Sequence, residues 1–159
     1  MLDLSTELAE LCRSHGALFI VNDHVDIAIL SGADGVHLGP DDLSVAGARD
    51  AAGSELMIGA SASTPAAGRE AEAAGADYLG VGPAYATPLK TEKKVIGPQG
   101  VAAVAGAVGI PVFAIGGIER RLLPELRAAG VTRVCAIRSL AAAADPEAEA
   151  RRFKEALGG

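Results

Sequence analysis

The clearest chemical pattern in the chain is the run Val81–Lys90, in which apolar residues lead through Gly82-Pro83 into a polar loop that ends on a lysine. A short buried strand, a Gly-Pro turn and a cationic loop with a hydroxyl group are typical of binding sites for phosphorylated ligands in parallel α/β proteins. Lys90 supplies the charge and Thr87 the hydroxyl. Because two more lysines follow, a solvated surface loop is the alternative interpretation of Lys90.

Other short apolar runs are also followed by polar residues or glycines. Asp23 and Asp42 are the acidic members of this set, and carboxylates are hard oxygen ligands that suit Mg²⁺ shared with phosphate oxygens. The alternative interpretation of both aspartates is that they cap helices. For the glycine pair Gly116-Gly117, the alternative is a simple tight turn. The full set is Asn22-Asp23, Asp41-Asp42, Ser61, Gly82–Lys90, Gly116-Gly117 and Arg138.

The elements that must position these residues alternate regularly. Apolar runs too short for helices predict strands at 18–21, 35–39, 56–61, 78–83, 111–115 and 131–137. Helical spacing of apolar residues predicts helices at 5–14, 25–29, 45–52, 64–74, 98–108, 122–129 and 146–157. This alternation predicts an α/β fold with a parallel sheet.

Two architectures fit that alternation, a β/α barrel and an open doubly wound sheet. In an open sheet the ligand draws on a few strands at one switch point, whereas in a barrel residues from every strand meet at one mouth. Since all six predicted strands end in polar residues or glycine, we expect a TIM-type barrel. A (β/α)8 barrel needs eight units, so we expect an incomplete barrel of about six parallel strands.

The amino-acid composition limits the kinds of partner that the protein can bind. The chain has 159 residues, which suits a single domain over residues 1–159. A formal net charge of −6 and only 3% aromatic residues argue against nucleic-acid binding. No apolar segment is long enough for a membrane span, Met1 is not followed by a signal-peptide profile, and Cys12 and Cys135 fit no metal-ligand spacing. We therefore expect a soluble cytoplasmic protein whose partners are small molecules or other proteins.

Taken together in this order and spacing, several glycine-rich motifs resemble the thiamine-phosphate synthase family. The resemblance runs from about residue 6 to the C-terminus. The motifs are Ile20-Val21-Asn22-Asp23, Gly32–Gly39 with Asp42, Gly59-Ala60-Ser61, Ala74–Tyr78 leading to Gly82-Pro83, Thr87 with Lys90, and Ala114–Ile118.

The resemblance implies a (β/α)8 barrel and a transferase of thiamine biosynthesis. Members join a pyrimidine diphosphate to a thiazole phosphate and release pyrophosphate with Mg²⁺. By resemblance, Asp23 and Asp42 bind the metal and Lys90 is the catalytic residue that neutralises the leaving pyrophosphate. The resemblance also implies that the substrate-binding residues are Asn22, Ser61, Thr87, Gly116, Gly117, Ile137 and Arg138.

The sequence also departs from the family. Its first two β/α units have no counterpart here, so we expect an N-terminally truncated barrel. Exposed sheet edges could then be covered in a homo-oligomer. His24 and Leu89 stand where the family often has an arginine and a second threonine.

Two alternatives to the synthase stay open. The first is a barrel fragment without catalytic activity that binds thiazole phosphate or depends on a partner. The second is a protein resembling the related thiazole tautomerase, which lacks the metal-binding acids and uses a histidine in the loop that here reads Ser61-Ala62-Ser63. His37 lies within a predicted strand, and we expect it to pack inside the barrel.

Overall fold

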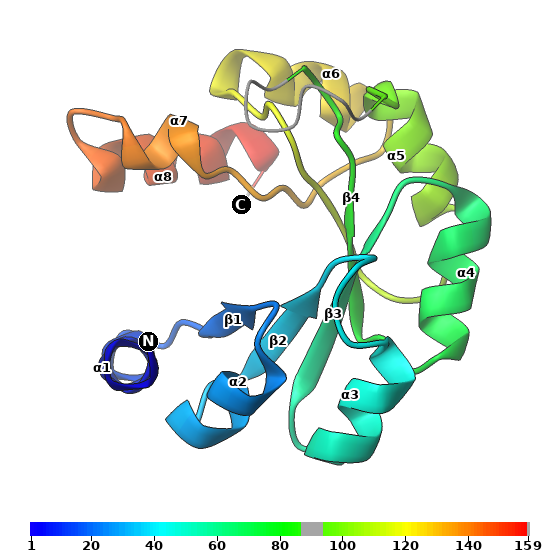
Figure 1. Ribbon diagram of the computed structural model, residues 1–159. Coiled ribbons are helices and arrows are strands. Elements are labelled where there is room, and N and C mark those ends of the chain that lie inside the picture. Colours follow the sequence, from blue (N-terminus) through cyan, green and yellow to red (C-terminus); the bar gives the residue numbers. More distant parts are fainter. Residues whose placement is uncertain (87–93, 159) are drawn as a thin grey trace. The chain divides into compact units, whose positions relative to one another are not determined.

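The computed structural model describes residues 1–86 and 94–158 (Figure 1). The chain divides into two compact units, one formed by Met1–Ser61 and Glu70–Leu79, the other by Ala62–Arg69 and Gly80–Gly159. In chain order the elements are α1 (Leu2–Ser14), β1 (Ile20–Asn22), α2 (Val25–Ser31), β2 (Gly35–Leu38), α3 (Val45–Ala52), β3 (Met57–Ala62), α4 (Pro65–Ala73), β4 (Tyr78–Val81), α5 (Gly97–Ala105), β5 (Val112–Ala114), η2 (Arg120–Leu122), α6 (Leu123–Ala128), α7 (Arg138–Ala141) and α8 (Pro146–Leu157).

The strands form one sheet in the order β1-β2-β3-β4-β5, so strands that follow one another in the chain are neighbours in the sheet. β1 pairs with β2 and β2 with β3 in parallel register, with Asn22 opposite His37 and His37 opposite Gly59. The predicted parallel α/β fold is therefore confirmed.

The two faces of β1, β2 and β3 differ in chemistry, because successive side chains of a strand point to opposite faces. One face carries Val21, Val36 and Ile58, which are buried in one cluster with residues of α2 and α3. In Figure 1 these two helices run beside the strands. The register places Asn22, His37 and Ser61 on the opposite face, which is therefore the polar face of these strands.

The second unit has an aliphatic core of its own. Its fully buried side chains include Val101 and Val104 of α5, and Leu123 and Leu126 of α6. Phe153 of α8 is 5% exposed. Because the chain has so few aromatic residues, the core of this unit is stabilised mainly by packing of aliphatic side chains and alanines.

The predicted sixth strand, at residues 131–137, is wrong. In this segment only Val134 pairs, in a single parallel bridge to Ala114 flanked by hydrogen bonds from Ala114 N to Arg133 O (2.9 Å) and from Cys135 N to Ala114 O (2.8 Å). Within the described part of the chain, no strand lies on its other side. An apolar run with one short neighbour cannot extend its ladder, so the described sheet has five strands rather than six.

The first helix begins earlier than the predicted start at residue 5. α1 starts at Leu2 with Met1 as the capping residue, and Ser5 and Thr6 lie inside the helix. The Thr6 hydroxyl donates to Leu2 O at 3.2 Å, which satisfies a polar side chain within a helix. Among the described residues, no helix has both the length and the apolar character that crossing a membrane requires.

Candidate active site

The end of β1 forms a tight corner at which Asn22, Asp23 and His24 are exposed. Asp23 has a φ of 69°, a left-handed conformation that aspartate tolerates better than most residues. Its backbone N–H donates to His37 O at 2.8 Å, and the N–H of His24 donates to Asn22 O at 2.9 Å. The side chain of His24, the capping residue of α2, makes no capping hydrogen bond. The Asp23 carboxylate accepts no hydrogen bond from a described residue, so the capping alternative for Asp23 is wrong.

Asp42 follows β2 and is fixed by the backbone of the same loop. Its Oδ2 accepts a hydrogen bond from Gly39 N at 2.7 Å. The cap of α3 is Ser44, whose hydroxyl accepts from Gly47 N at 3.1 Å. The capping alternative for Asp42 is therefore also wrong, and the Gly39 amide holds one oxygen of an exposed carboxylate at the end of β2.

Asp23 and Asp42 offer two carboxylates, which suits Mg²⁺ better than a metal ion whose ligands all come from the protein. Mg²⁺ is usually held by one or two carboxylates, with waters and substrate phosphates completing its shell. Two exposed aspartates at the ends of neighbouring strands supply such a set. The described residues contain no group of three or more His, Cys, Asp or Glu side chains that could hold a metal by themselves.

Ser61 lies on the polar face of β3 and contacts a histidine. Its Oγ is 3.0 Å from Nε2 of His37, whose Nδ1 is 3.2 Å from the hydroxyl of Tyr78. All three side chains are half-buried. Ser61 is thus held by a group that sequence reasoning had assigned to packing alone.

In the second unit, Gly116 and Gly117 form a turn that only glycine can build. Their φ angles are 88° and 64°. A Cβ on Gly116 would lie 2.7 Å from Pro83 Cβ, and one on Gly117 would lie 2.6 Å from Ala86 O. The backbone of this turn therefore packs against the start of the loop that follows β4, in addition to forming a tight turn.

Ile137 and Arg138 lie at the start of α7, and both are exposed. Ser139 Oγ donates to Ile118 O at 2.5 Å, which ties this start to the segment after the glycine turn. The N–H groups of Gly116, Gly117 and Arg138 donate to no described residue. Arg138 also lines an open hollow of about 390 Å³, together with Glu119, Arg120, Arg121, Ser139 and Glu149.

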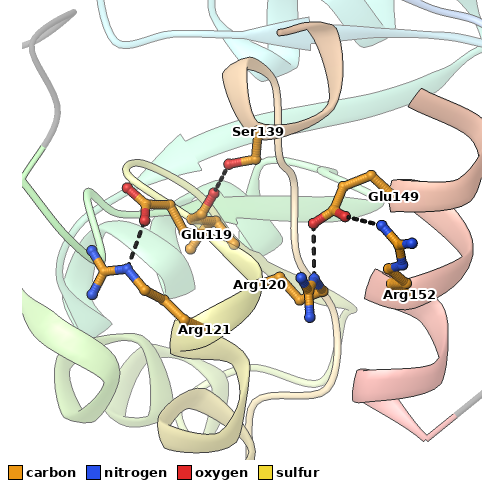
Figure 2. Close-up of polar contacts among 7 residues, drawn as sticks. Glu119, Arg120, Arg121, Ser139, Glu149 and Arg152 are labelled. Carbon is orange, nitrogen blue, oxygen red and sulfur yellow. Dashed lines mark hydrogen bonds and ion pairs between the residues drawn. The ribbon is translucent and has the colours of Figure 1, made fainter. Parts of the chain in front are cut away.

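The charges around this hollow are unequally paired (Figure 2). Arg120 binds Glu149 at 2.9 Å, and Arg121 binds Glu119 at 2.8 Å. The hydrogen bond from Arg120 lowers the pKa of the Glu149 carboxyl below its usual value of 4.5, with a smaller contribution from Arg152. Arg138 forms no ion pair with a described residue. Among the described lining residues, Arg138 thus offers a guanidinium suited to an anion.

The structure brings the predicted site residues into two groups. Asn22, Asp23, Asp42 and Ser61 belong to the first unit, and Gly116, Gly117, Ile137 and Arg138 to the second. Thr87 and Lys90 lie outside the described residues. Sequence reasoning missed Ser139 and the Arg120–Glu149 pair. In the sequence Ser139 follows Arg138 and Arg120 lies shortly after the glycine turn, but nothing along the chain points to Glu149.

Comparison with known proteins identifies the family. The family model described as thiamine monophosphate synthase matches residues 1–140. This chain belongs to the thiamine monophosphate synthase family. The solved structure of thiamine phosphate pyrophosphorylase from Pyrococcus furiosus, a similar protein, superposes with a TM-score of 0.91 at 35% identity over 99% of this chain and 75% of that one.

Two family relatives differ in how much of their length the chain spans. The thiamine-phosphate synthase of Gloeobacter violaceus is 47% identical over 157 residues, 99% of this chain but 46% of the relative. That of Caldivirga maquilingensis is 43% identical over 156 residues, 98% of this chain and 76% of the relative. The chain therefore spans less than half of one family member and three quarters of another.

Proposed function

We propose that the chain acts as a thiamine-phosphate synthase, joining 4-amino-5-hydroxymethyl-2-methylpyrimidine diphosphate to thiazole phosphate to give thiamine phosphate and pyrophosphate. Membership of the family supports this proposal, and the observation that carries it is the pair of exposed carboxylates, Asp23 and Asp42, at the ends of two neighbouring strands. Such a pair suits a diphosphate held through Mg²⁺, because Mg²⁺ is usually bound by one or two carboxylates together with substrate phosphates.

The first unit would bind the pyrimidine diphosphate. Asp23 and Asp42 would hold Mg²⁺, which, when bound, stabilises negative charge on the phosphate oxygens. Asn22 and Ser61 would donate hydrogen bonds to the same anion from the polar face of the sheet. Because Gly39 fixes one oxygen of Asp42, that carboxylate needs little reorganisation when the diphosphate binds.

The second unit would bind the phosphate of the thiazole. The N–H groups of Gly116, Gly117 and Arg138 are suited to an oxyanion, and so is the guanidinium of Arg138, which forms no ion pair with a described residue. Ile137 would contribute its backbone at the start of α7. The ion pairs of Arg120 and Arg121 hold those guanidinium groups on their own carboxylates, which leaves Arg138 as the cation for the ligand among the described lining residues.

The reaction would need leaving-group stabilisation more than proton transfer. As the C–O bond of the pyrimidine methylene breaks, pyrophosphate departs with the bonding electrons, and the thiazole nitrogen then donates its lone pair to the resulting cation. Ser61 and Lys90 would stabilise the charge that grows on the pyrophosphate, and Thr87 would contact the pyrimidine. In this proposal the site residues, including Ser61 and Asp42, orient anions and stabilise their charge rather than transfer protons.

The same proposal extends to the barrel architecture, the cellular location and the self-association of the protein. The sequential order of the five strands is what a β/α barrel requires, so we infer that the chain forms part of such a barrel. We also infer that the protein works in the cytoplasm on small phosphorylated substrates, and that self-association covers open sheet edges.

The deciding experiment measures pyrophosphate release by the 159-residue protein. We expect release only with both substrates and Mg²⁺ present, and loss of release in Asp42→Asn. A protein that is folded by circular dichroism yet releases no pyrophosphate would overturn the synthase proposal. If that protein still bound thiazole phosphate by calorimetry, a phosphate-binding role without catalysis would replace it.

A further inference from the structure

A chain of three polar side chains crosses the polar face of the first unit. Ser61 of β3, His37 of β2 and Tyr78 of β4 are joined by contacts of 3.0 Å at Nε2 and 3.2 Å at Nδ1 of the histidine. The rings of His37 and Tyr78 have centroids 5.5 Å apart. Both ring nitrogens of His37 therefore have hydrogen-bond partners. The partner of Nε2 is Ser61, which is predicted to bind the diphosphate.

The backbone leaves space for this arrangement. Gly59 lies opposite His37 in the sheet, and a Cβ there would come within 2.0 Å of the Tyr78 ring. Any larger residue at 59 would displace the tyrosine ring. The absence of a side chain at Gly59 is thus what allows Tyr78 to reach His37, so this arrangement depends on the sequence at three strands.

The hydrogen-bond roles follow from the chemistry of imidazole. A neutral histidine has one N–H donor and one acceptor nitrogen, and the partner of one nitrogen decides the role of the other. A tyrosine hydroxyl that donates to Nδ1 leaves the proton on Nε2, which then donates to Ser61 Oγ. In the opposite tautomer, Nε2 accepts the proton of Ser61 instead.

These two states differ in what Ser61 can offer a ligand. When Nε2–H donates to its oxygen, the serine hydroxyl keeps its own proton for an anionic acceptor. When Nε2 accepts, that proton is already used inside the protein. Only the first state suits a serine that must donate to a pyrophosphate oxygen.

We propose that His37 is a positioning residue, held in its Nε2–H tautomer by Tyr78, that turns the Ser61 hydroxyl proton toward the bound pyrophosphate group. The inference rests on the function proposed above for Ser61. It gives His37 a role that acts through Ser61 rather than directly on the substrate.

One test observes the tautomer directly in the resting protein and needs no substrate. Long-range ¹H–¹⁵N correlation spectra of the resting protein should show the His37 proton on Nε2. Tyr78→Phe removes the hydroxyl that donates to Nδ1 and should increase the Nδ1–H population. A resting protein with the proton on Nδ1 would overturn the proposal, whether or not the enzyme turns over.

A second test measures binding of inorganic pyrophosphate with Mg²⁺ by calorimetry. We expect Ser61→Ala and His37→Leu each to weaken binding about tenfold, the effect of about one hydrogen bond to a charged group. In the Ser61→Ala background, His37→Leu should have no further effect. His37→Gln, which keeps a donor near the Nε2 position, should recover most of the loss, and the exposed His15→Gln should bind as the wild type does.

The outcomes separate this inference from the proposed function. Independent, additive losses from His37→Leu and Ser61→Ala would show that His37 contributes only to packing, even in an active synthase. Coupled losses in a protein that binds pyrophosphate but never forms thiamine phosphate would support the role of His37 and overturn the synthase proposal. Circular dichroism of each variant confirms that binding is measured on folded protein.

Discussion

The hydroxyl of Tyr85 lies 3.0 Å from Oε2 of Glu125, and this contact anchors the start of the loop after β4 to helix α6. The backbone N–H of Tyr85 also donates to Gly116 O at 3.0 Å. Tyr85 therefore holds the first residues of this loop against both the glycine turn and a helix. Burial, followed by the hydrogen bond and charge of Glu125, raises the pKa of Tyr85 to about 12.

This shift predicts how stability depends on alkaline pH. The pKa is raised from 10.0, so the folded state holds the phenol proton more tightly than the unfolded state does. The contribution to the free energy of unfolding is full below about pH 10 and falls as pH rises toward about 12. We expect Tyr85→Phe to be less stable than wild type at pH 8, with the difference shrinking over that window in urea unfolding.

The same contact can be titrated spectroscopically. The chain has two tyrosines, so Tyr78→Phe leaves Tyr85 as the single phenol for an ultraviolet titration. Glu125→Gln should then lower the Tyr85 pKa, because it removes the carboxylate charge. An unchanged titration curve in Glu125→Gln would contradict the role assigned to Glu125.

The glycine turn makes a prediction about packing. Gly117 and Gly16 have nearly equal φ angles, 64° and 65°, but a Cβ on Gly16 meets nothing within 4 Å. Gly16→Ala should cost only the left-handed strain of about 1–2 kcal/mol. Gly117→Ala should cost about 1–3 kcal/mol more, because the new methyl would overlap the backbone of Tyr85 and Ala86. Equal losses in chemical denaturation would show that the close approach contributes nothing.

The paired carboxylates predict the metal dependence of anion binding. Asp42→Asn keeps a carbonyl oxygen that can accept from Gly39 N but removes the charge, so the loop geometry should persist while Mg²⁺ affinity falls. We expect binding of pyrophosphate with Mg²⁺ to weaken about tenfold or more in Asp23→Asn and in Asp42→Asn. Asp50→Asn, an exposed change in α3, should have no effect. Binding that is unchanged in both site variants would rule out the metal role.

Helix ends with local signals were predictable from the sequence. The predicted bounds of α3 and α8 match the structure, Val45–Ala52 and Pro146–Leu157. In both, the capping side chain is the residue just before the helix, Ser44 or Asp145, and accepts an N–H three residues further on. Such signals lie within four residues of one another, so they can be read along the chain.

Features that depend on distant residues were not predictable in the same way. The apolar run at residues 131–137 has the composition of a strand, but whether a strand forms depends on its neighbours in the sheet. The contact of His37 with Ser61 and Tyr78 spans 24 and 41 residues, and the space that allows it is set by Gly59. A histidine in a strand looks like a packed residue until its partners are known.

The Arg120–Glu149 pair predicts that the hollow can be made more attractive to anions. Glu149 accepts from Arg120 at 2.9 Å and from Arg152 at 3.3 Å. Glu149→Gln would remove one negative charge from the lining and release Arg120 toward the ligand. We expect affinity for inorganic phosphate at pH 7 to rise about two- to fivefold, the value of an exposed ion pair, and the gain to shrink at high salt. Calorimetry at two salt concentrations measures it.

A matched change on the same helix provides the control. Glu147 pairs with Arg151 on α8 but does not line the hollow, so Glu147→Gln should leave phosphate affinity unchanged. The two variants should also differ in how their stability changes at acidic pH. Because the folded-state pKa of Glu149 is lowered from 4.5, its contribution to stability is present above that pH and is lost as pH falls through the lowered value. Glu149→Gln should therefore flatten the acid limb of the stability profile. Equal gains in phosphate affinity from both changes would mean that net charge, rather than the release of Arg120, controls the hollow.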